Sequence, residues 1–434
     1  MGDTSSLVES GAGAAVSPNV KDSWLSELGP GLITGAADDD PSGIATYSQA
    51  GAQFGFALAW TVLLTYPLMI GIQVVSAKIG SVSGHGLATN IRKHYPRWLL
   101  YVIVGLLVAA NTINIAADLS AMGDAVKLVA GGNSHVYVIV LGLLSAGLQI
   151  FVPYRRYVGI LKWLTLALFA YVGTVFVVEV PWAEVVHQVL LPKWSWSPEY
   201  VTTLVAILGT TISPYLFFWQ ASQEVEETLA DPERVPLKRA PVARVKAAFR
   251  RIKIDTYVGM AVSNLVAFFI IVTAAVTLFA HGITDVQSSA QAASALKPVA
   301  GELAFALFSL GIVGTGLLAI PVLAGSAAYA VAGTFKWKNS LEHAPSAAKE
   351  FYGIIAVAML GGILIGFLPI DPIKALYWSA VMNGVIAVPI MVVMMLLAAR
   401  PDVMGTLVIS RRLKILGWIG TGAMALAAIA MFVV

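Results

Sequence analysis

Long apolar runs recur along almost the whole chain, and they constrain its fold more than any other feature. A membrane-spanning helix needs roughly 20 mostly apolar residues, and the sequence contains about eleven such runs. They lie at residues 28–55, 57–79, 98–125, 135–153, 157–180, 200–224, 255–280, 299–332, 351–369, 373–398 and 413–433. The sequence therefore predicts an all-α membrane protein with about eleven transmembrane helices.

The amino-acid composition also indicates a membrane protein. Of the 434 residues, 58% are hydrophobic and 12% are charged, whereas a typical soluble domain carries about 25% charged residues. The absence of cysteine excludes thiolate metal sites and disulfides. Residues 1–23 lack the basic and compact apolar regions of a signal peptide, so they are predicted to form a flexible cytoplasmic tail.

Lysine and arginine alternate between the two sets of loops. One set holds only Lys127, Lys193, Lys297 and Lys374, and the other set and the tail hold the rest of the 27. This bias predicts an inner (plasma) membrane protein with a cytoplasmic N-terminus and an outside C-terminus. The charged segment 225–253 is expected to be a cytoplasmic loop near lipid headgroups, with no nucleic-acid partner. The acids at the end of the sixth span, Glu224, Glu226 and Glu227, are expected in a solvated cytoplasmic vestibule.

Two of the apolar runs are interrupted by polar residues and a proline. The first reads GPGLITGAADDDPSGIAT over residues 29–46, and the sixth reads GTTISPYLFFWQ over residues 209–220. Proline removes a backbone donor, and the carbonyls left free in lipid need protein, water or an ion as partner. Because five spans separate the interruptions, two five-span repeats would have opposite orientation, as in many transporters. We expect these repeats at 24–180 and 200–398, with 413–433 as an extra helix.

Asp40 is the most informative residue of the first interruption. A carboxylate at membrane depth is costly and usually marks function. No lysine or arginine lies in the same or the matching span, so a bound cation is the natural partner. Helix capping before Pro41 is the alternative for Asp40, and equally for Asp38 and Asp39. Three successive acids point in different directions, so they cannot all ligate one ion directly.

Further polar residues lie inside predicted spans, among them Asn111, Thr112, Asn114, Asn264 and the two that matter most for the site. Asp118 is in the third span and Asn383 is in the tenth. Either could line a pathway, and either could make a hydrogen bond between helices.

Several short motifs carry a resemblance to a known family. They are Gly29-Pro30-Gly31, Asp40-Pro41, Gln49-Ala50-Gly51, Ser76-Ala77-Lys78-Ile79-Gly80, Asp118-Leu119 and Ser213-Pro214. In these the chain resembles the Nramp family of divalent-metal transporters, and more specifically the divergent branch of Nramp-related magnesium transporters. The resemblance implies a leucine-transporter-like 5+5 inverted repeat plus one extra helix, with helices 1 and 6 broken.

The resemblance also implies a metal site, with departures from the family pattern. The metal-binding aspartate of the family falls on Asp40, and its metal-binding asparagine falls on Gly43, which has no side chain. In the sixth span a carbonyl ligand can persist at Thr210, the methionine sulfur is replaced by Ser213, and the histidine is replaced by Tyr215. Oxygen ligands suit Mg²⁺ and Mn²⁺ better than softer metals, and Mg²⁺ keeps several waters. Asp38 and Asp39 could then accept hydrogen bonds from ion-bound water.

At the positions that the resemblance links to proton transfer, this chain also differs from the family pattern. Asp118 matches, but the acid three residues on is replaced by Ala121, and 351–369 lacks the family's basic residues. The expected function is therefore alternating-access transport of Mg²⁺ and/or Mn²⁺ without obligatory proton coupling. The metal is a substrate, and no permanently bound cofactor is expected.

Three other functions compete with this one. A proton-coupled Mn²⁺/Fe²⁺ symporter and an organic-solute symporter would share the fold, although Asp40 would repel a substrate carboxylate. A membrane-embedded enzyme is disfavoured because HExxH, GxSxG and an intramembrane histidine are all missing. The choice between Mg²⁺ and Mn²⁺, the coupling ion, the direction of transport and the oligomeric state stay open.

Overall fold

The computed structural model describes residues 34–35, 37–152, 164–230, 235–341 and 343–434, and in these residues it contains helices and no strand. The longer helices are α2 (Pro41–Phe54), α3 (Thr61–Ser83), α5 (Arg97–Ala130), α6 (Ser134–Phe151), α10 (Pro198–Thr211), α11 (Pro214–Ala230), α12 (Val242–Thr277), α15 (Ala304–Phe335), α16 (Lys349–Ile365), α17 (Pro372–Ala398) and α19 (Arg411–Val433). The shorter ones are α4 (Leu87–His94), α8 (Phe169–Val177), α9 (Trp182–Leu190), α13 (Ser289–Ser294), α14 (Lys297–Ala300) and α18 (Pro401–Met404).

In the described part of the chain, eight helices are long and apolar enough to cross a membrane. The number rises to nine if the pair Leu166–Val177 and Trp182–Leu190, bent by 116°, is one span. With 14 and 17 residues, α2 and α16 are shorter than the roughly 20 residues of a typical crossing. The membrane character is therefore clear, whereas the count of eleven and the repeat boundaries stay predictions.

Both predicted helix interruptions are present. In the first, Thr34, Gly35, Ala37 and Asp38 are helical, Asp39 and Asp40 are not, and α2 begins at Pro41. In the second, α10 ends at Thr211 and α11 begins at Pro214. Proline starts a helix well because the first N–H of a helix has no intrahelical partner, but it cannot continue the preceding one. The broken helices 1 and 6 are therefore confirmed, and the motif at 29–31 lies outside the described residues.

Most of the charged segment 225–253, which was expected to be a loop, is helical in the described residues. The helix α11 continues to Ala230, and α12 begins at Val242 and runs for 36 residues. Two apolar residues in this extension, Val245 and Ile252, are buried, so packing holds the first turns of α12 against the rest of the protein. The segment therefore mainly extends its neighbouring helices.

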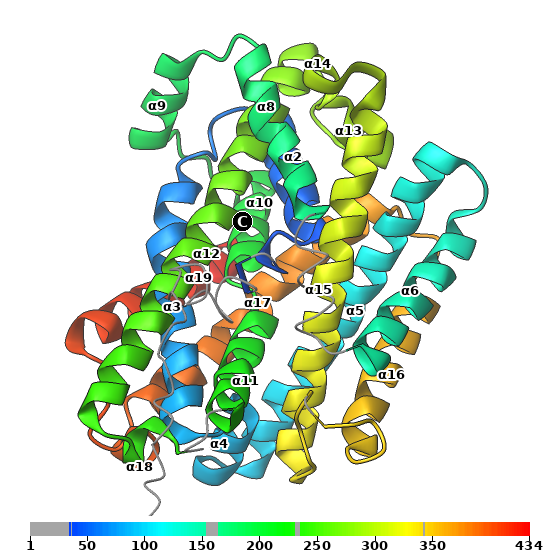
Figure 1. Cartoon of the computed structure of the whole chain (residues 1–434). Helices are drawn as coiled ribbons and strands as arrows, with labels where there is room; N and C mark the ends of the chain where they lie inside the picture. Colours follow the sequence, from blue (N-terminus) through cyan, green and yellow to red (C-terminus); the bar gives the residue numbers. More distant parts are fainter. Residues whose placement is uncertain (1–33, 36, 153–163, 231–234, 342) are drawn as a thin grey trace, which may run out of the picture.

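Small residues bring the central helices into close contact. A Cβ atom on Gly209 of α10 would overlap the backbone of Ala380 and Gly384 in α17. A Cβ atom on Gly35 would likewise overlap the backbone of Gly259 in α12. Such approaches are typical of helices that pack inside a bilayer. In Figure 1, α2, α10 and α17 lie in the middle, with α5, α6 and α16 to one side and α3 and α19 to the other.

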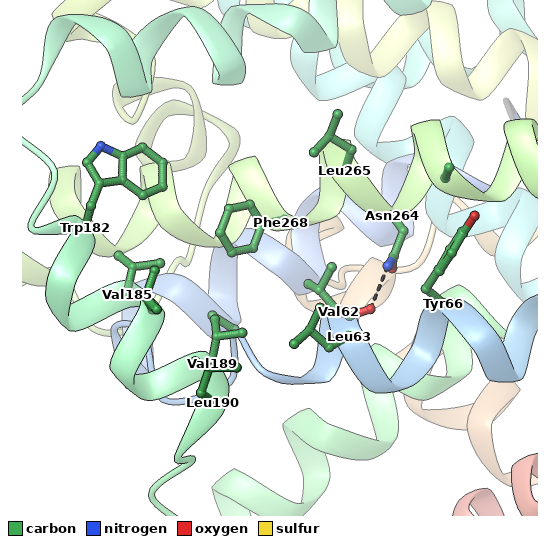
Figure 2. A pocket seen from close by; sticks show the side chains of 13 residues that line it. Val62, Leu63, Tyr66, Trp182, Val185, Val189, Leu190, Asn264, Leu265 and Phe268 are labelled. Atoms are coloured by element: carbon green, nitrogen blue, oxygen red, sulfur yellow. Dashed lines mark hydrogen bonds between the residues drawn. The ribbon is translucent and has the colours of Figure 1, made fainter.

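An apolar groove lies at the surface between α3, α9 and α12. It has a volume of about 520 Å³, and its walls include Leu63, Trp182 and Leu265. Its polar wall residue, Asn264, donates a hydrogen bond of 2.6 Å to the carbonyl of Val62 (Figure 2). Since Asn264 is satisfied in this way, the groove presents a mainly hydrocarbon surface.

Candidate functional site

The residues singled out by the sequence gather around the two helix breaks and are closed off from solvent. Asp38 and Asp40 are 0% and 1% exposed. The full set, all of it buried, is Asp38, Asp39, Asp40, Gly43, Asp118, Thr210, Ser213, Tyr215 and Asn383. Neither side of the bilayer has open access to these side chains in this conformation.

Asp40 caps α2 with one carboxylate oxygen. Its Oδ1 accepts hydrogen bonds from the Gly43 backbone N–H at 2.8 Å and from the Ser42 hydroxyl at 2.6 Å. The second oxygen, Oδ2, lies 3.4 Å from the hydroxyl of Tyr215. That hydroxyl has a better acceptor in the Ala37 carbonyl, at 3.0 Å. Capping therefore uses one oxygen of Asp40 and leaves the other weakly engaged at the break, where it could hold a cation.

The carbonyl of Thr210 lies on the other side of the interruption. In a continuous helix it would accept from the N–H four residues on, but that residue is Pro214, which has none. The Ser213 hydroxyl substitutes in part, since it lies 2.9 Å from the Thr210 carbonyl and 2.8 Å from the Gly209 carbonyl. Ser213 therefore directs its proton at the backbone of its own helix, and one lone pair of the Thr210 carbonyl stays available.

The side chains of Thr210 and Tyr47 lie against Gly43. A Cβ atom placed there would lie 3.2 Å from Thr210 Oγ1 and 3.3 Å from Cε2 of Tyr47. The Ser42 hydroxyl lies 3.5 Å from Thr210 Oγ1. The space that a longer side chain at position 43 would need is thus occupied by Tyr47 and Thr210. Sequence reasoning missed Ser42 and Tyr47, although Tyr47 stands one helical turn after Gly43 on the same face of α2.

Asp38 and Asp39 share a single donor from α12. The Ser263 hydroxyl lies 2.7 Å from Oδ2 of Asp38 and 3.0 Å from Oδ1 of Asp39. One hydroxyl proton can serve only one of them well, and Oδ1 of Asp38 has no hydrogen-bond partner in the described structure. Among the described residues no three His, Cys, Asp or Glu side chains form a metal cluster. An ion at the breaks would therefore be held by a mixture of ligand types.

Asp118 lies near these groups but outside their hydrogen-bond network. Neither of its carboxylate oxygens has a hydrogen-bond partner among the described residues, and the same holds for the side-chain amides of Asn114 and Asn383. Asp118 is close enough to Asp40 for the two carboxylates to interact electrostatically. Buried polar groups of this kind usually bind water or an ion. Asn114, one turn before Asp118 on α5, is recognised in the sequence as a polar residue inside a span, but an isolated amide in an apolar helix is too weak a signal to mark it as a site residue.

A hydrogen-bonded chain ties the breaks to the far end of α11. Thr34 donates to Gln220 at 2.6 Å, Gln220 donates to Glu224 at 3.1 Å, and Arg251 of α12 contacts the same carboxylate at 2.5 Å. Glu226 accepts from Tyr329 and from Ser340, each at 2.7 Å. The expectation of a solvated vestibule is wrong for Glu226, which is buried with Tyr329 and Ser340. Glu224 does line a polar cleft, but its carboxylate is 1% exposed and is paired with the partly exposed Arg251.

Two polar clefts lie at opposite ends of the broken helices. One, of about 510 Å³, is lined by Gln49 and Gln53 of α2 and by Glu199 of α10. The other, of about 440 Å³, is lined by Glu227 and Thr228 near the end of α11. In Figure 1, α2 runs from the middle of the molecule toward one end and α11 toward the other. The buried site therefore lies between a cleft on each side.

Interrupted helices that face each other around a buried carboxylate define a membrane transporter in which the substrate is held between two halves. Solved structures agree with this class. A crystal structure of a manganese transporter from Eremococcus coleocola matches with a TM-score of 0.74 and 18% identity, over 95% of this chain and 87% of that one. Mhp1, a nucleobase-cation-symport-1 family transporter, matches with a TM-score of 0.55 and 13% identity, over 93% and 91%.

Sequence comparison identifies the family. The model described as natural resistance-associated macrophage protein-like (Nramp) matches residues 31–434, and the chain belongs to this family. The divalent metal cation transporter MntH of Klebsiella pneumoniae (strain 342) is 27% identical over 424 residues, 96% of this chain and 95% of that protein. The predicted family, the leucine-transporter-like fold class and the assignment as a transporter rather than an enzyme are confirmed.

Proposed function

We propose that this protein carries Mg²⁺ and/or Mn²⁺ across the inner membrane by alternating access, without obligatory proton coupling. The observation that supports this most directly is the second carboxylate oxygen of Asp40, buried and weakly engaged between the two helix breaks. An anionic substrate would be repelled by such a group, whereas a cation is attracted to it. The relatives named as a divalent metal cation transporter and a manganese transporter favour a divalent ion.

The groups near Asp40 that would face a cation, either directly or through its bound water, carry oxygen. They comprise the carboxylate, the carbonyl of Thr210 and the hydroxyls of Ser42, Tyr47, Thr210 and Tyr215. At the two positions where typical relatives have sulfur and imidazole, this chain has Ser213 and Tyr215. Oxygen donors suit Mg²⁺ and Mn²⁺, and neutral hydroxyls match the waters that Mg²⁺ retains. Asp38 and Asp39, held by Ser263, would add negative potential and accept from such waters.

Alternating access would open the buried site to one polar cleft at a time. The chain Thr34–Gln220–Glu224–Arg251 would keep the site closed on the α11 side, which the lysine and arginine pattern predicts to be cytoplasmic. Release to that side would require these bonds to break, while Gln49 and Gln53 would line entry from the outside. We propose the predicted orientation, with the N-terminus inside and the C-terminus outside.

The membrane potential alone can drive uptake of a divalent cation, without a coupled proton. A membrane potential of about 100 mV contributes roughly 2.3 kcal/mol per elementary charge, and about twice that for a divalent ion. An inside-negative potential would therefore drive the ion inward. The proton-coupled Mn²⁺/Fe²⁺ symporter is the second candidate, favoured by Asp118, whose carboxylate lies near Asp40.

The test is metal uptake by purified protein in liposomes. Wild type should take up Mg²⁺ or Mn²⁺, and Asp40→Ala should reduce uptake to the background of empty liposomes because the anionic ligand is gone. Glu302→Gln, at an exposed position in the short 3-10 helix Gly301–Leu303, is the matched control and should transport normally. Equal chromatographic behaviour of all three proteins would show that they are folded, and near-normal uptake by Asp40→Ala would refute the proposal.

A further inference from the structure

Tyr47 fills the space that Gly43 leaves vacant. Both lie on α2, and the four-residue spacing puts them on the same face. The Cε2 atom of Tyr47 would lie 3.3 Å from a Cβ atom on Gly43, and Tyr47 is 1% exposed. The ring is therefore a fixed wall of the site beside Thr210.

The hydroxyl of Tyr47 lies near three carboxylates and has no hydrogen-bond partner of ordinary geometry among the described residues. It faces the hydroxyl of Thr210, makes no hydrogen bond of ordinary geometry in the described structure, and interacts electrostatically with Asp38, Asp39 and Asp40. Leaving such a group unpaired in a buried site is unfavourable. A polar ligand that occupies the site during transport would satisfy it.

A row of hydroxyls connects this phenol to Asp40. The Ser42 hydroxyl donates to Oδ1 of Asp40 at 2.6 Å and lies 3.5 Å from Thr210 Oγ1, which faces Tyr47. A neutral phenol is a poor direct ligand for a hard cation but both donates and accepts hydrogen bonds. Its natural partner here is therefore a water molecule that the cation carries.

We propose that Tyr47 is a specificity-determining residue whose hydroxyl binds a water of a partly hydrated divalent cation held at Asp40. This inference rests on the proposed function. In typical relatives an amide side chain at the position of Gly43 binds the metal directly, whereas here Gly43 and Tyr47 together exchange that direct ligand for a contact through water. Gly43 and Tyr47 together therefore favour binding of Mg²⁺, which gives up its waters reluctantly, over binding of ions that lose their waters easily.

Tyr47→Phe removes only the oxygen atom and keeps the ring against Gly43. The matched control is Tyr171→Phe, because Tyr171 is also buried with an unbonded hydroxyl but has no carboxylate among its electrostatic neighbours. Loss of one hydrogen bond to ion-bound water should weaken Mg²⁺ binding about two- to tenfold. Mn²⁺ binding should change less, so that the ratio of Mn²⁺ to Mg²⁺ affinity rises in Tyr47→Phe and stays constant in Tyr171→Phe.

Isothermal titration calorimetry with each metal alone separates the outcomes. A raised ratio only in Tyr47→Phe supports the inference. Wild-type affinities in that variant, or equal weakening of both metals, overturn it while leaving the proposed function intact. Wild-type protein that binds neither metal would instead refute the proposed function. If Tyr47→Phe does not yield folded protein, Tyr47→Leu removes the same hydroxyl with a smaller side chain, and an unchanged ratio there overturns the inference equally.

Discussion

The hydroxyl of Tyr215 lies 3.4 Å from Oδ2 of Asp40 and so joins α11 to the break in the first helix. The same hydroxyl donates to the Ala37 carbonyl at 3.0 Å, on the other side of that break. The side chain of Tyr215, which follows the second helix break, therefore contacts residues on both sides of the first break. A neutral phenol at this point keeps the partner of Asp40 uncharged at any physiological pH.

Tyr215→His should make transport depend on pH. Histidine titrates near neutrality, and an imidazolium beside Asp40 would repel a divalent cation. Metal uptake by the variant should therefore fall relative to wild type as the pH drops from about 8 to 5.5. Uptake assays across this range, normalised to Tyr215→Phe, measure the effect. Parallel pH profiles for the His and Phe variants would show that position 215 does not face the ion.

Ser213→Met should shift selectivity toward softer metals. A thioether favours Cd²⁺ over Mg²⁺ and improves Mn²⁺ relative to Mg²⁺. Ser213→Ala is the control, because it also removes the hydroxyl that bonds the carbonyls of Gly209 and Thr210 but adds no sulfur. Calorimetric affinities for the three metals should change order in the Met variant only. If Ala and Met variants behave alike, the freed carbonyl and not sulfur sets the preference.

Gly209→Ala should destabilise the protein. The added Cβ atom would overlap the carbonyl of Ala380 and the backbone of Gly384, and overpacking typically costs about 1–3 kcal/mol. Gly105→Ala is the matched control, since a Cβ atom there meets nothing within 4 Å. Thermal unfolding in detergent should show a lower midpoint for Gly209→Ala only. Equal midpoints for the two variants would mean that α10 and α17 can separate at no cost.

The interruptions and the burial of Asp40 were predictable because local chemistry determines them. Pro41 and Pro214 end one helical segment and start the next wherever the surrounding helices lie. An acid beside such a break inside an apolar run has no water nearby to solvate it. Its burial therefore followed from the sequence without knowledge of any tertiary contact.

The partners of these groups were not predictable because they come from distant parts of the chain. Ser263 meets Asp38 from 225 residues away, and a serine in an apolar helix has no distinctive pattern. Tyr47 looked like an ordinary apolar helix residue until Gly43 and Thr210 were placed beside it. Glu224 looked solvated because its helix ends in a charged segment, yet α12 brings Arg251 against it.

The final prediction is that metal uptake does not acidify the liposome lumen. Proton relays through membranes need a series of titratable groups, and the described neighbours of Asp118 offer it no hydrogen bond. At the positions where the resemblance to the family implies a relay acid and a histidine, this chain has Ala121 and Tyr215. Outside the spans, burial lowers the pKa of His85 to about 4, so this imidazole is neutral during uptake at pH 7 and cannot supply the missing step.

A pH-sensitive dye in the lumen measures the coupling during Mg²⁺ or Mn²⁺ uptake driven by an inside-negative potential. Luminal pH should stay constant in wild type, and Asp118→Asn should keep substantial uptake, because the ion gradient and the potential supply the driving force. Asp40→Ala provides the baseline without transport. Metal-dependent acidification that disappears in Asp118→Asn would establish proton symport through this carboxylate and rule out the uniport, since a lone acid would then have an onward path that this conformation does not contain.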